Sequence, residues 1–245
     1  MLSSSQFLLR LLVLTTGVYG DRRPLHIGGF MPVTGIGFPV ASAARPAVNL
    51  AVELINNSSG ILPDYELILD IYDTQHSAMV GLKQFFEMVN KTTPTIFMVG
   101  PAISPVSVHL CVAASSWNVV QVSFSTRTSA LEDRELYPYF YRTIPSDAML
   151  NTLRHQFLRT FGWSRVAVIY EEYEGDLFYA GLPELVVKLK TDNISVLTFE
   201  KVDTTNYAST LQTLKDLDAR IIIVNIFFPT ARNFFCETSK AICSL

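Results

Sequence analysis

Residues 220–227 read Arg-Ile-Ile-Ile-Val-Asn-Ile-Phe, and this stretch decides the expected fold. Six of its eight residues are large and apolar, and they do not alternate with polar ones. A short run of this kind, rich in β-branched residues, is typical of a strand that is covered on both faces. The run is also too short to span a bilayer. It therefore predicts a strand in a parallel sheet flanked by helices.

The rest of the chain alternates between further extended apolar runs and amphipathic helical windows. Strands that alternate with helices of this length predict βαβ units, and hence an α/β fold. The expected strands cover residues 25–30, 67–72, 95–99, 119–124, 139–142, 165–170, 195–199 and 220–227. The expected helices cover residues 44–55, 78–89, 106–117, 148–161, 176–189, 207–217 and the segment from 231 onward.

The number of strands is large for one sheet, so we expect two lobes, the second of them incomplete. The segment Ile144-Pro145-Ser146-Asp147 suits the crossover between the lobes, with Ser146 or Asp147 capping the next helix. The expected division is a signal peptide at 1–20, a first lobe at 21–145 and a partial second lobe at 146–245.

Composition and motifs exclude several classes of protein. The 245 residues are 49% hydrophobic with a net charge of −3, which allows a core but no basic surface for nucleic acid. The sequence has no phosphate-binding loop, dinucleotide fingerprint, metal-spaced histidines or nucleophile elbow. The adjacent carboxylates of Glu171 and Glu172 follow a strand, and we interpret them as solvated. We therefore predict no enzyme, no cofactor and no metal site.

The N-terminus has the pattern of a secretory signal peptide. A short apolar core from Phe7 to Leu14 is interrupted by Arg10, and Val18 and Gly20 stand at the −3 and −1 positions before Asp21. A buried N-terminal helix is the alternative. Secretion makes the Asn-X-Ser/Thr sequons meaningful, and each falls near an expected helix end or turn. The candidate glycan acceptors are Asn56, Asn57, Asn90 and Asn193.

Three cysteines in an oxidising compartment leave at least one without a partner in this chain. We interpret Cys111, in an apolar helical window, as a small buried hydrophobe. On one continuous helix Cys236 and Cys243 would be about 10 Å apart, which is too far for a disulfide. The helix would have to end near Ser239 for the two to pair. We therefore expect a fragment whose partner cysteine is missing.

One loop favours ligand binding. Gly100-Pro101-Ala102-Ile103-Ser104 joins a strand to a helix, at the edge where open α/β sheets bind ligands. A serine beside free helix N–H groups suits an anion such as an amino-acid carboxylate. Arg127 follows the next strand on the same edge and would add a positive charge. The alternative is that Ser104 only caps its helix.

Several stretches together resemble the extracellular Venus-flytrap domain of type B GABA receptors, which are class C G-protein-coupled receptors. The resemblance implies a type I periplasmic-binding-protein-like fold, and it is closer to the subunit-2 branch. It covers residues 24–242 and rests on Ile27-Gly28, Met31-Pro32, Arg45–Val48, Ile61–Leu67, Trp117-Asn118, Val120–Phe124, Tyr137–Asp147, Gly162-Trp163, Asp218–Ile222 and Phe235-Cys236.

The resemblance also implies a ligand site with one anchor left. The family's carboxylate-binding serine matches Ser104, and its stacking aromatic, a tryptophan in the GABA-binding subunit, falls on Phe38. Its second ligand serine falls near Arg127 and its second-lobe tyrosine near Phe227. Each lost polar contact costs on the order of 1–3 kcal/mol, so weak or absent GABA binding is expected. Cys236 matches a half-cystine whose partner would lie beyond the chain end.

Members of the family pair through helices of the first lobe. The candidate pairing surface in this chain is Phe85, Phe86 and Val89. The alternative is that about half of residues 85–89 pack in the core, because consecutive helix positions point to different faces. The implied partners are a second type B GABA receptor subunit, an amino-acid-like ligand, and a G protein through a membrane segment absent from this chain. The implied location is the extracellular side of the plasma membrane. The alternatives are a secreted amino-acid-binding protein and a natriuretic-peptide-receptor-like guanylate cyclase ectodomain.

Overall fold

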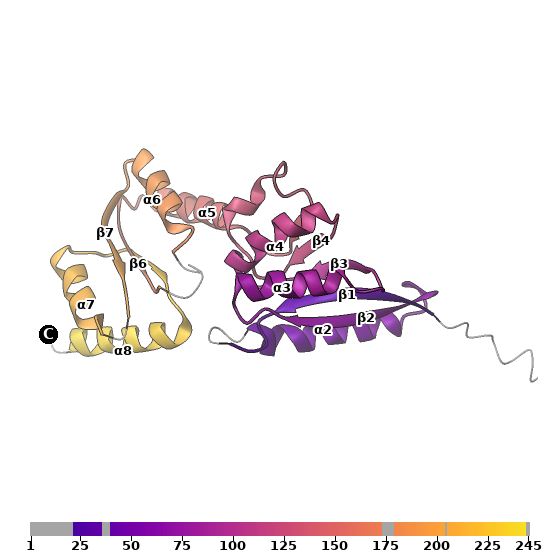
Figure 1. The fold of residues 1–245 in the computed structure, drawn as a ribbon. Coiled ribbons are helices and arrows are strands. Elements are labelled where there is room, and N and C mark those ends of the chain that lie inside the picture. The colour runs from indigo at the N-terminus through magenta and orange to yellow at the C-terminus, as the bar shows by residue number, and fades with distance from the viewer. Residues whose placement is uncertain (1–21, 36–39, 173–178, 204, 244–245) are drawn as a thin grey trace, which may run out of the picture.

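A computed structural model describes residues 22–35, 40–172, 179–203 and 205–243. Within them the chain forms two parallel sheets, one after the other along the sequence (Figure 1). The alternation of strands and helices confirms the predicted α/β, periplasmic-binding-protein-like fold. No helix among these residues combines the length and the apolar character needed to cross a bilayer.

The first sheet has five parallel strands in the order β2-β1-β3-β4-β5. Strand β1 lies between β2 and β3, so the chain moves to one side of β1 to form β2 and then crosses to the other side to form β3. Because these two connections run in opposite directions, they place helices on both faces of the sheet. Figure 1 shows α2 on one face and α3 with α4 on the other. The strands are β1 (Arg23–Met31), β2 (Tyr65–Asp73), β3 (Thr95–Val99), β4 (Val120–Ser123) and β5 (Phe140–Arg142). The helices are α2 (Val40–Asn56), α3 (Ala78–Val89), α4 (Ser104–Ser116) and the 3₁₀ turn η1 (Ser129–Glu132).

The core of this first unit lies on the α3 and α4 face. Phe30 of β1 stacks on Tyr72 of β2 with ring centroids 4.9 Å apart, and both are buried. Helices α3 and α4 cover these rings, with members such as Phe85 and Leu110 completely buried. Cys111 is also buried, as predicted, and burial raises the pKa of its thiol to about 12.

The second sheet has three parallel strands in the order β7-β6-β8. The side chains of the middle strand, β6, pack in the core on both faces of the sheet, because successive side chains of a strand point in opposite directions. Val166 and Val168 pack with α5 and α6, whereas Ala167 and Ile169 pack with α7 and α8. The strands are β6 (Arg165–Tyr170), β7 (Ser195–Lys201) and β8 (Ile222–Asn225), and the helices are α5 (Asp147–Thr160), α6 (Leu182–Thr191), α7 (Tyr207–Asp216) and α8 (Phe228–Cys243).

Several predicted elements match the structure closely and a few differ. Helix α3 and strand β6 have the predicted bounds, and Ser146 caps α5 by accepting a hydrogen bond from the Met149 N–H at 3.2 Å. Helix α6 begins at Leu182, not at 176, because Gly181 is its N-cap and Pro183 stands in its first turn. Residues 176–178 lie outside the described part. The η1 turn was not predicted.

The stretch 220–227 is less buried than its composition predicts. Only Ile222–Asn225 forms strand β8, and the Ile222 side chain is 37% exposed. The physical reason is position, since β8 pairs on one side only among the described residues. Helix α8 is continuous from Phe228 to Cys243, so Cys236 and Cys243 are too far apart to form a disulfide with each other.

Candidate ligand-binding site

The loop between β3 and α4 is held against β1 by a glycine. Gly100 has φ +98°, and a Cβ atom there would lie 2.1 Å from the carbonyl oxygen of Phe30. Any other residue would clash with this backbone and would also be strained at that φ. The chain therefore passes directly over the end of β1 before it turns into α4.

Buried hydroxyl groups fix the next residue of the loop. The carbonyl oxygen of Pro101 lies 2.7 Å from Ser123 Oγ, 3.0 Å from Ser107 Oγ and 3.0 Å from Thr126 Oγ1. All three hydroxyl-bearing residues are completely buried. Ser107 Oγ and Thr126 Oγ1 are themselves 2.6 Å apart. Each hydroxyl has one proton, so Ser107 and Thr126 together supply only two of the three hydrogen bonds that this triangle would allow.

Ser123 has a different role from the other two hydroxyl residues. It donates to the Pro101 carbonyl and accepts from the Thr126 N–H at 3.1 Å, so it links the loop after β3 to the loop after β4. Sequence reasoning did not single out Ser123 or Thr126. Their common partner became visible only in the structure, because Pro101 is more than 20 residues away.

Ser104, the predicted carboxylate anchor, stands at the first position of α4. The N-cap residue is Ile103, which has no capping side chain, so the alternative that Ser104 caps the helix is wrong. Its half-buried hydroxyl has no hydrogen-bond partner among the described residues. Free N–H groups at a helix N-terminus attract negative charge. The loop thus presents an unused hydroxyl beside an uncapped helix end.

Arg127, the predicted positive charge, is already paired. Its Nε lies 3.3 Å from Asp147 Oδ1, and its carbonyl accepts the Asp147 N–H at 2.8 Å. Burial raises the pKa of the Asp147 carboxyl, and the charge of Arg127 opposes that rise. Gly181 lies against this carboxyl group, since a Cβ atom there would be 2.6 Å from Asp147 Cβ. The Arg127 guanidinium therefore already has a carboxylate partner before any ligand arrives.

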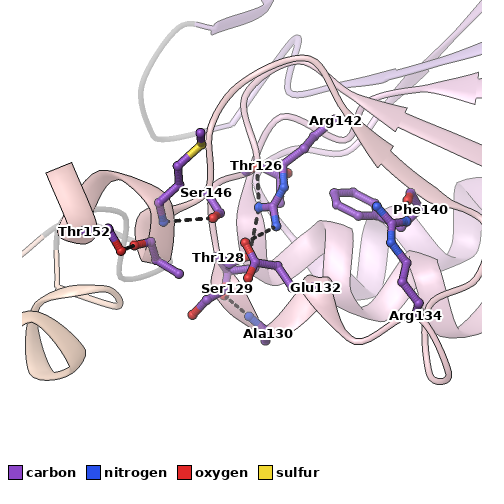
Figure 2. Close-up of polar contacts among 12 residues, drawn as sticks. Thr126, Thr128, Ser129, Ala130, Glu132, Arg134, Phe140, Arg142, Ser146 and Thr152 are labelled. Atoms are coloured by element: carbon purple, nitrogen blue, oxygen red, sulfur yellow. Dashed lines mark hydrogen bonds and ion pairs between the residues drawn. The ribbon is translucent and has the colours of Figure 1, made fainter. Parts of the chain in front are cut away.

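The segment that carries Arg127 is secured by a second arginine, which sequence reasoning missed. Figure 2 shows Arg142 of β5 reaching across the loop to the Thr128 carbonyl at 3.0 Å and to Glu132 Oε1 at 3.3 Å. Burial lowers the pKa of the Arg142 guanidinium, and Glu132 opposes this change. The Arg134 guanidinium donates to the Phe140 carbonyl in the same loop. The β4–β5 loop is thus built around arginine contacts to backbone oxygens.

The remaining predicted residues lie apart from Ser104 in the sequence. Phe38 lies outside the described residues. Phe227 is half-buried after β8, and its N–H donates to Glu171 Oε2 at 2.9 Å. Glu171 Oε1 also accepts from the Thr230 hydroxyl at 2.8 Å, so the interpretation of Glu171 as merely solvated is wrong. Its carboxylate satisfies donors at the start of α8, which is a structural task.

The predicted pairing surface divides between core and exterior. Phe85 is completely buried, so it packs the interior instead of facing a partner. Phe86 is 43% exposed, and Trp117, at the end of α4, is 49% exposed. Their rings meet edge to face with centroids 5.5 Å apart. Val89 is partly buried against the same core. The exposed aromatic pair on this side of the first unit is therefore Phe86 with Trp117.

Comparison with known proteins shows the family of this chain. The model of the receptor family ligand-binding region matches residues 43–243. The chain belongs to this receptor family. The relatives that align with this chain are named as receptors, which confirms the predicted resemblance and the prediction of a ligand-binding region instead of an enzyme. The matched residues include every strand except β1, together with the loop between β3 and α4.

Individual receptors from this family align over most of the chain. Gamma-aminobutyric acid type B receptor subunit 1 of Mus musculus is 34% identical over 223 residues, which is 91% of this chain and 23% of the relative. Subunit 2 of Rattus norvegicus is 34% identical over 216 residues, covering 86% and 22%. Taste receptor type 1 member 3 of Felis catus is 32% identical over 143 residues, covering 52% and 16%. The chain therefore spans less than a quarter of the length of these receptors.

Proposed function

We propose that this chain is the extracellular ligand-binding and heterodimerisation region of a metabotropic GABA-type G-protein-coupled receptor, in a subunit that binds GABA weakly or not at all. The relatives named above support the receptor class. The proposal of weak GABA binding rests on the surroundings of two polar side chains at the loop edge, Ser104 and Arg127. The Ser104 hydroxyl has no hydrogen-bond partner among the described residues, whereas the charge of Arg127 is paired with buried Asp147.

The energetic argument follows from what an amino-acid ligand needs. Its carboxylate and its ammonium both lose water on binding, and each unpaired polar group costs on the order of 1–3 kcal/mol. Two such losses weaken affinity by roughly 30-fold to 10⁴-fold, because each 1.4 kcal/mol is tenfold. One serine at a helix end does not offset such losses. Phe38 and Phe227 would supply apolar contact at the remaining positions of this proposed site.

Titration calorimetry of GABA into the ectodomain that contains this chain tests the proposal. We expect no saturable heat at micromolar GABA, and the same flat titration for Ser104→Ala. A micromolar dissociation constant that is lost in Ser104→Ala would show that the site is intact and would overturn the weak-binding part. If a Ser104→Arg variant gains binding of a simple carboxylate, this result would support the proposal that the loop between β3 and α4 is the remnant of a ligand site.

The proposed arrangement within the receptor follows the same reasoning. Residues 21–145 would form the first lobe and 146–245 part of the second, with a signal peptide at 1–20 and the extracellular face of the plasma membrane as location. Cys236 is exposed, which leaves it accessible to a partner cysteine elsewhere in a longer chain. A G protein would be reached only through a membrane segment outside this sequence.

Heterodimer formation is proposed to use the exposed Phe86–Trp117 pair. Co-precipitation of the ectodomain with a second type B receptor subunit tests it. We expect Phe86→Asp to reduce pairing at least tenfold. Leu153→Asp is the matched control, because Leu153 is a similarly exposed apolar residue, at 54%, on α5 of the second unit. Equal loss in both variants, or no loss in either, would contradict this surface.

A further inference from the structure

The overlapping sequons Asn56-Asn57-Ser58 and Asn57-Ser58-Ser59 place two candidate glycan acceptors side by side. The structure gives the two asparagines different surroundings. Asn56 is the last residue of α2, and its side chain is half-buried. Asn57 follows the helix and is exposed, and its side chain has no hydrogen-bond partner among the described residues.

The Asn56 side chain clamps the edge strand of the first sheet. Its Oδ1 accepts the Leu67 N–H at 2.8 Å, and its Nδ2 donates to the Leu67 carbonyl at 2.9 Å. Leu67 is buried in β2, and no strand formed by the described residues lies beyond β2 in this sheet. An edge strand leaves such backbone groups unpaired. Asn56 therefore supplies the donor and the acceptor that a neighbouring strand would have supplied.

This two-point contact uses a particular proton of the Asn56 amide. To face one residue with both Oδ1 and an N–H, the amide must donate the proton on the same side of the C–N bond as Oδ1. In a substituted amide the preferred trans form places the substituent on that same side, as it does in the peptide bond. The cis alternative is disfavoured for a secondary amide. A glycan on Asn56 would thus occupy the position of the proton that binds Leu67.

We propose that Asn57 is the N-glycan acceptor of this pair and that Asn56 is reserved for the clamp on Leu67. In the transfer, Asn57 Nδ2 forms a bond to the anomeric carbon of a lipid-linked oligosaccharide diphosphate. The carbon–oxygen bond to the diphosphate breaks, the diphosphate leaves with the bonding electrons, and the amide gives up one proton. The inference rests on entry into the secretory pathway, which is part of the proposed function.

Two serine variants separate the sequons without touching either asparagine. Ser59→Ala removes only the Asn57 sequon, and Ser58→Ala removes only the Asn56 sequon. The natural protein is expressed in a secreting animal cell, and glycans are released enzymatically in heavy-oxygen water, which marks each acceptor for peptide mass spectrometry. We expect wild type and Ser58→Ala to be marked at Asn57. We expect Ser59→Ala to leave this segment unmarked in the secreted protein.

The clamp has its own readout, independent of glycan occupancy. Asn56→Asp keeps the shape and the acceptor but removes the donor to Leu67, whereas Asn57→Asp changes only an exposed group. After all glycans are removed, we expect Asn56→Asp to lower Tm by about 2–4 °C and Asn57→Asp to leave it unchanged. Equal Tm values for the two variants would show that the contact between Asn56 and Leu67 does not stabilise the fold, and would contradict the reason for assigning the glycan to Asn57.

The outcomes distinguish this inference from the proposed function. A mark on Asn56 in the secreted protein, or an unmarked Asn57, overturns the inference. If Asn90 or Asn193 is marked at the same time, the failure concerns the choice between Asn56 and Asn57 alone. If no sequon is marked, the secretory route fails as well.

Discussion

The two sheets distribute their cores differently. In the first sheet the main cluster lies on one face, under α3 and α4, and helix α2 on the other face keeps Leu50 and Leu54 more than half exposed. In the second sheet the single strand β6 serves two clusters, one on each face, and the side chains of Val166 through Ile169 are completely buried. The unit with fewer strands therefore depends more heavily on one strand.

The first unit instead concentrates constraint in a loop. Gly100 and Pro101 are fixed by backbone proximity and by three buried hydroxyl groups, at the edge where Ser104 is presented. Stability in the second unit therefore rests on apolar burial along β6. In the first unit the candidate site rests on polar contacts that hold a loop. Each tryptophan reports on one unit, since Trp117 follows α4 and Trp163 follows α5.

The largest effect is expected in β6. Ile169→Ala removes a completely buried side chain and should lower the free energy of unfolding of the second unit by about 2–5 kcal/mol. Ile222→Ala in β8 is the matched control and should cost less, because Ile222 is 37% exposed. Urea unfolding followed by Trp163 fluorescence in a Trp117→Phe background measures both. Equal losses would break the distinction between β6 and β8.

The next effect is expected at the loop of the first unit. Gly100→Ala places a methyl group against the Phe30 carbonyl and imposes a strained φ, with a cost of at least about 1–3 kcal/mol. Gly60→Ala is the control, because apart from its chain neighbours no described residue has a heavy atom within 4 Å of the added Cβ. Fluorescence of Trp117 in a Trp163→Phe background reports the transition. An unchanged midpoint for Gly100→Ala would contradict the close approach of the loop to β1.

A smaller and more selective effect is expected among the buried hydroxyl groups. Ser123→Ala leaves the Thr126 N–H without its acceptor and should cost about 1–3 kcal/mol. Ser107→Ala should cost less, because Thr126 can then donate to the Pro101 carbonyl without competition. Denaturant midpoints of the two variants give the order. If Ser107→Ala is the more damaging change, the assignment of donors around Pro101 is wrong.

The smallest effect concerns pH and the contact between the two units. Because burial raises the pKa of Asp147 above the ordinary value of 3.8, the folded state binds this proton more tightly than the unfolded state does. Its contribution to stability therefore falls as pH rises from about that value through the raised pKa. Asp147→Asn should remove this slope. If the difference in free energy of unfolding between wild type and Asp147→Asn instead grows with pH in this interval, the charge of Arg127 lowers the pKa of Asp147 more than burial raises it.

Local signals predicted the elements well. The apolar period of α3, the β-branched run of β6 and the serine before α5 each act within a few residues, so the chain sequence contains them directly. The same signals overstated the burial of residues 220–227, because composition does not report how many neighbours a strand has. The predicted start of α6 was wrong, because Gly181 and Pro183 favour a helix that begins between them and the apolar pattern does not contain this signal.

For the candidate site, the sequence indicated the position of Ser104 but not its surroundings. The α/β alternation, the loop at the sheet edge and the two overlapping sequons can be read from the amino-acid sequence, since these depend on residue type and short-range backbone geometry. Only the tertiary structure decided that Arg127 is paired with Asp147, that Glu171 serves α8 and that Asn56 clamps Leu67. The reason is physical. These polar groups find their partners by proximity in the folded chain, and the partners lie between 11 and 59 positions away in the sequence.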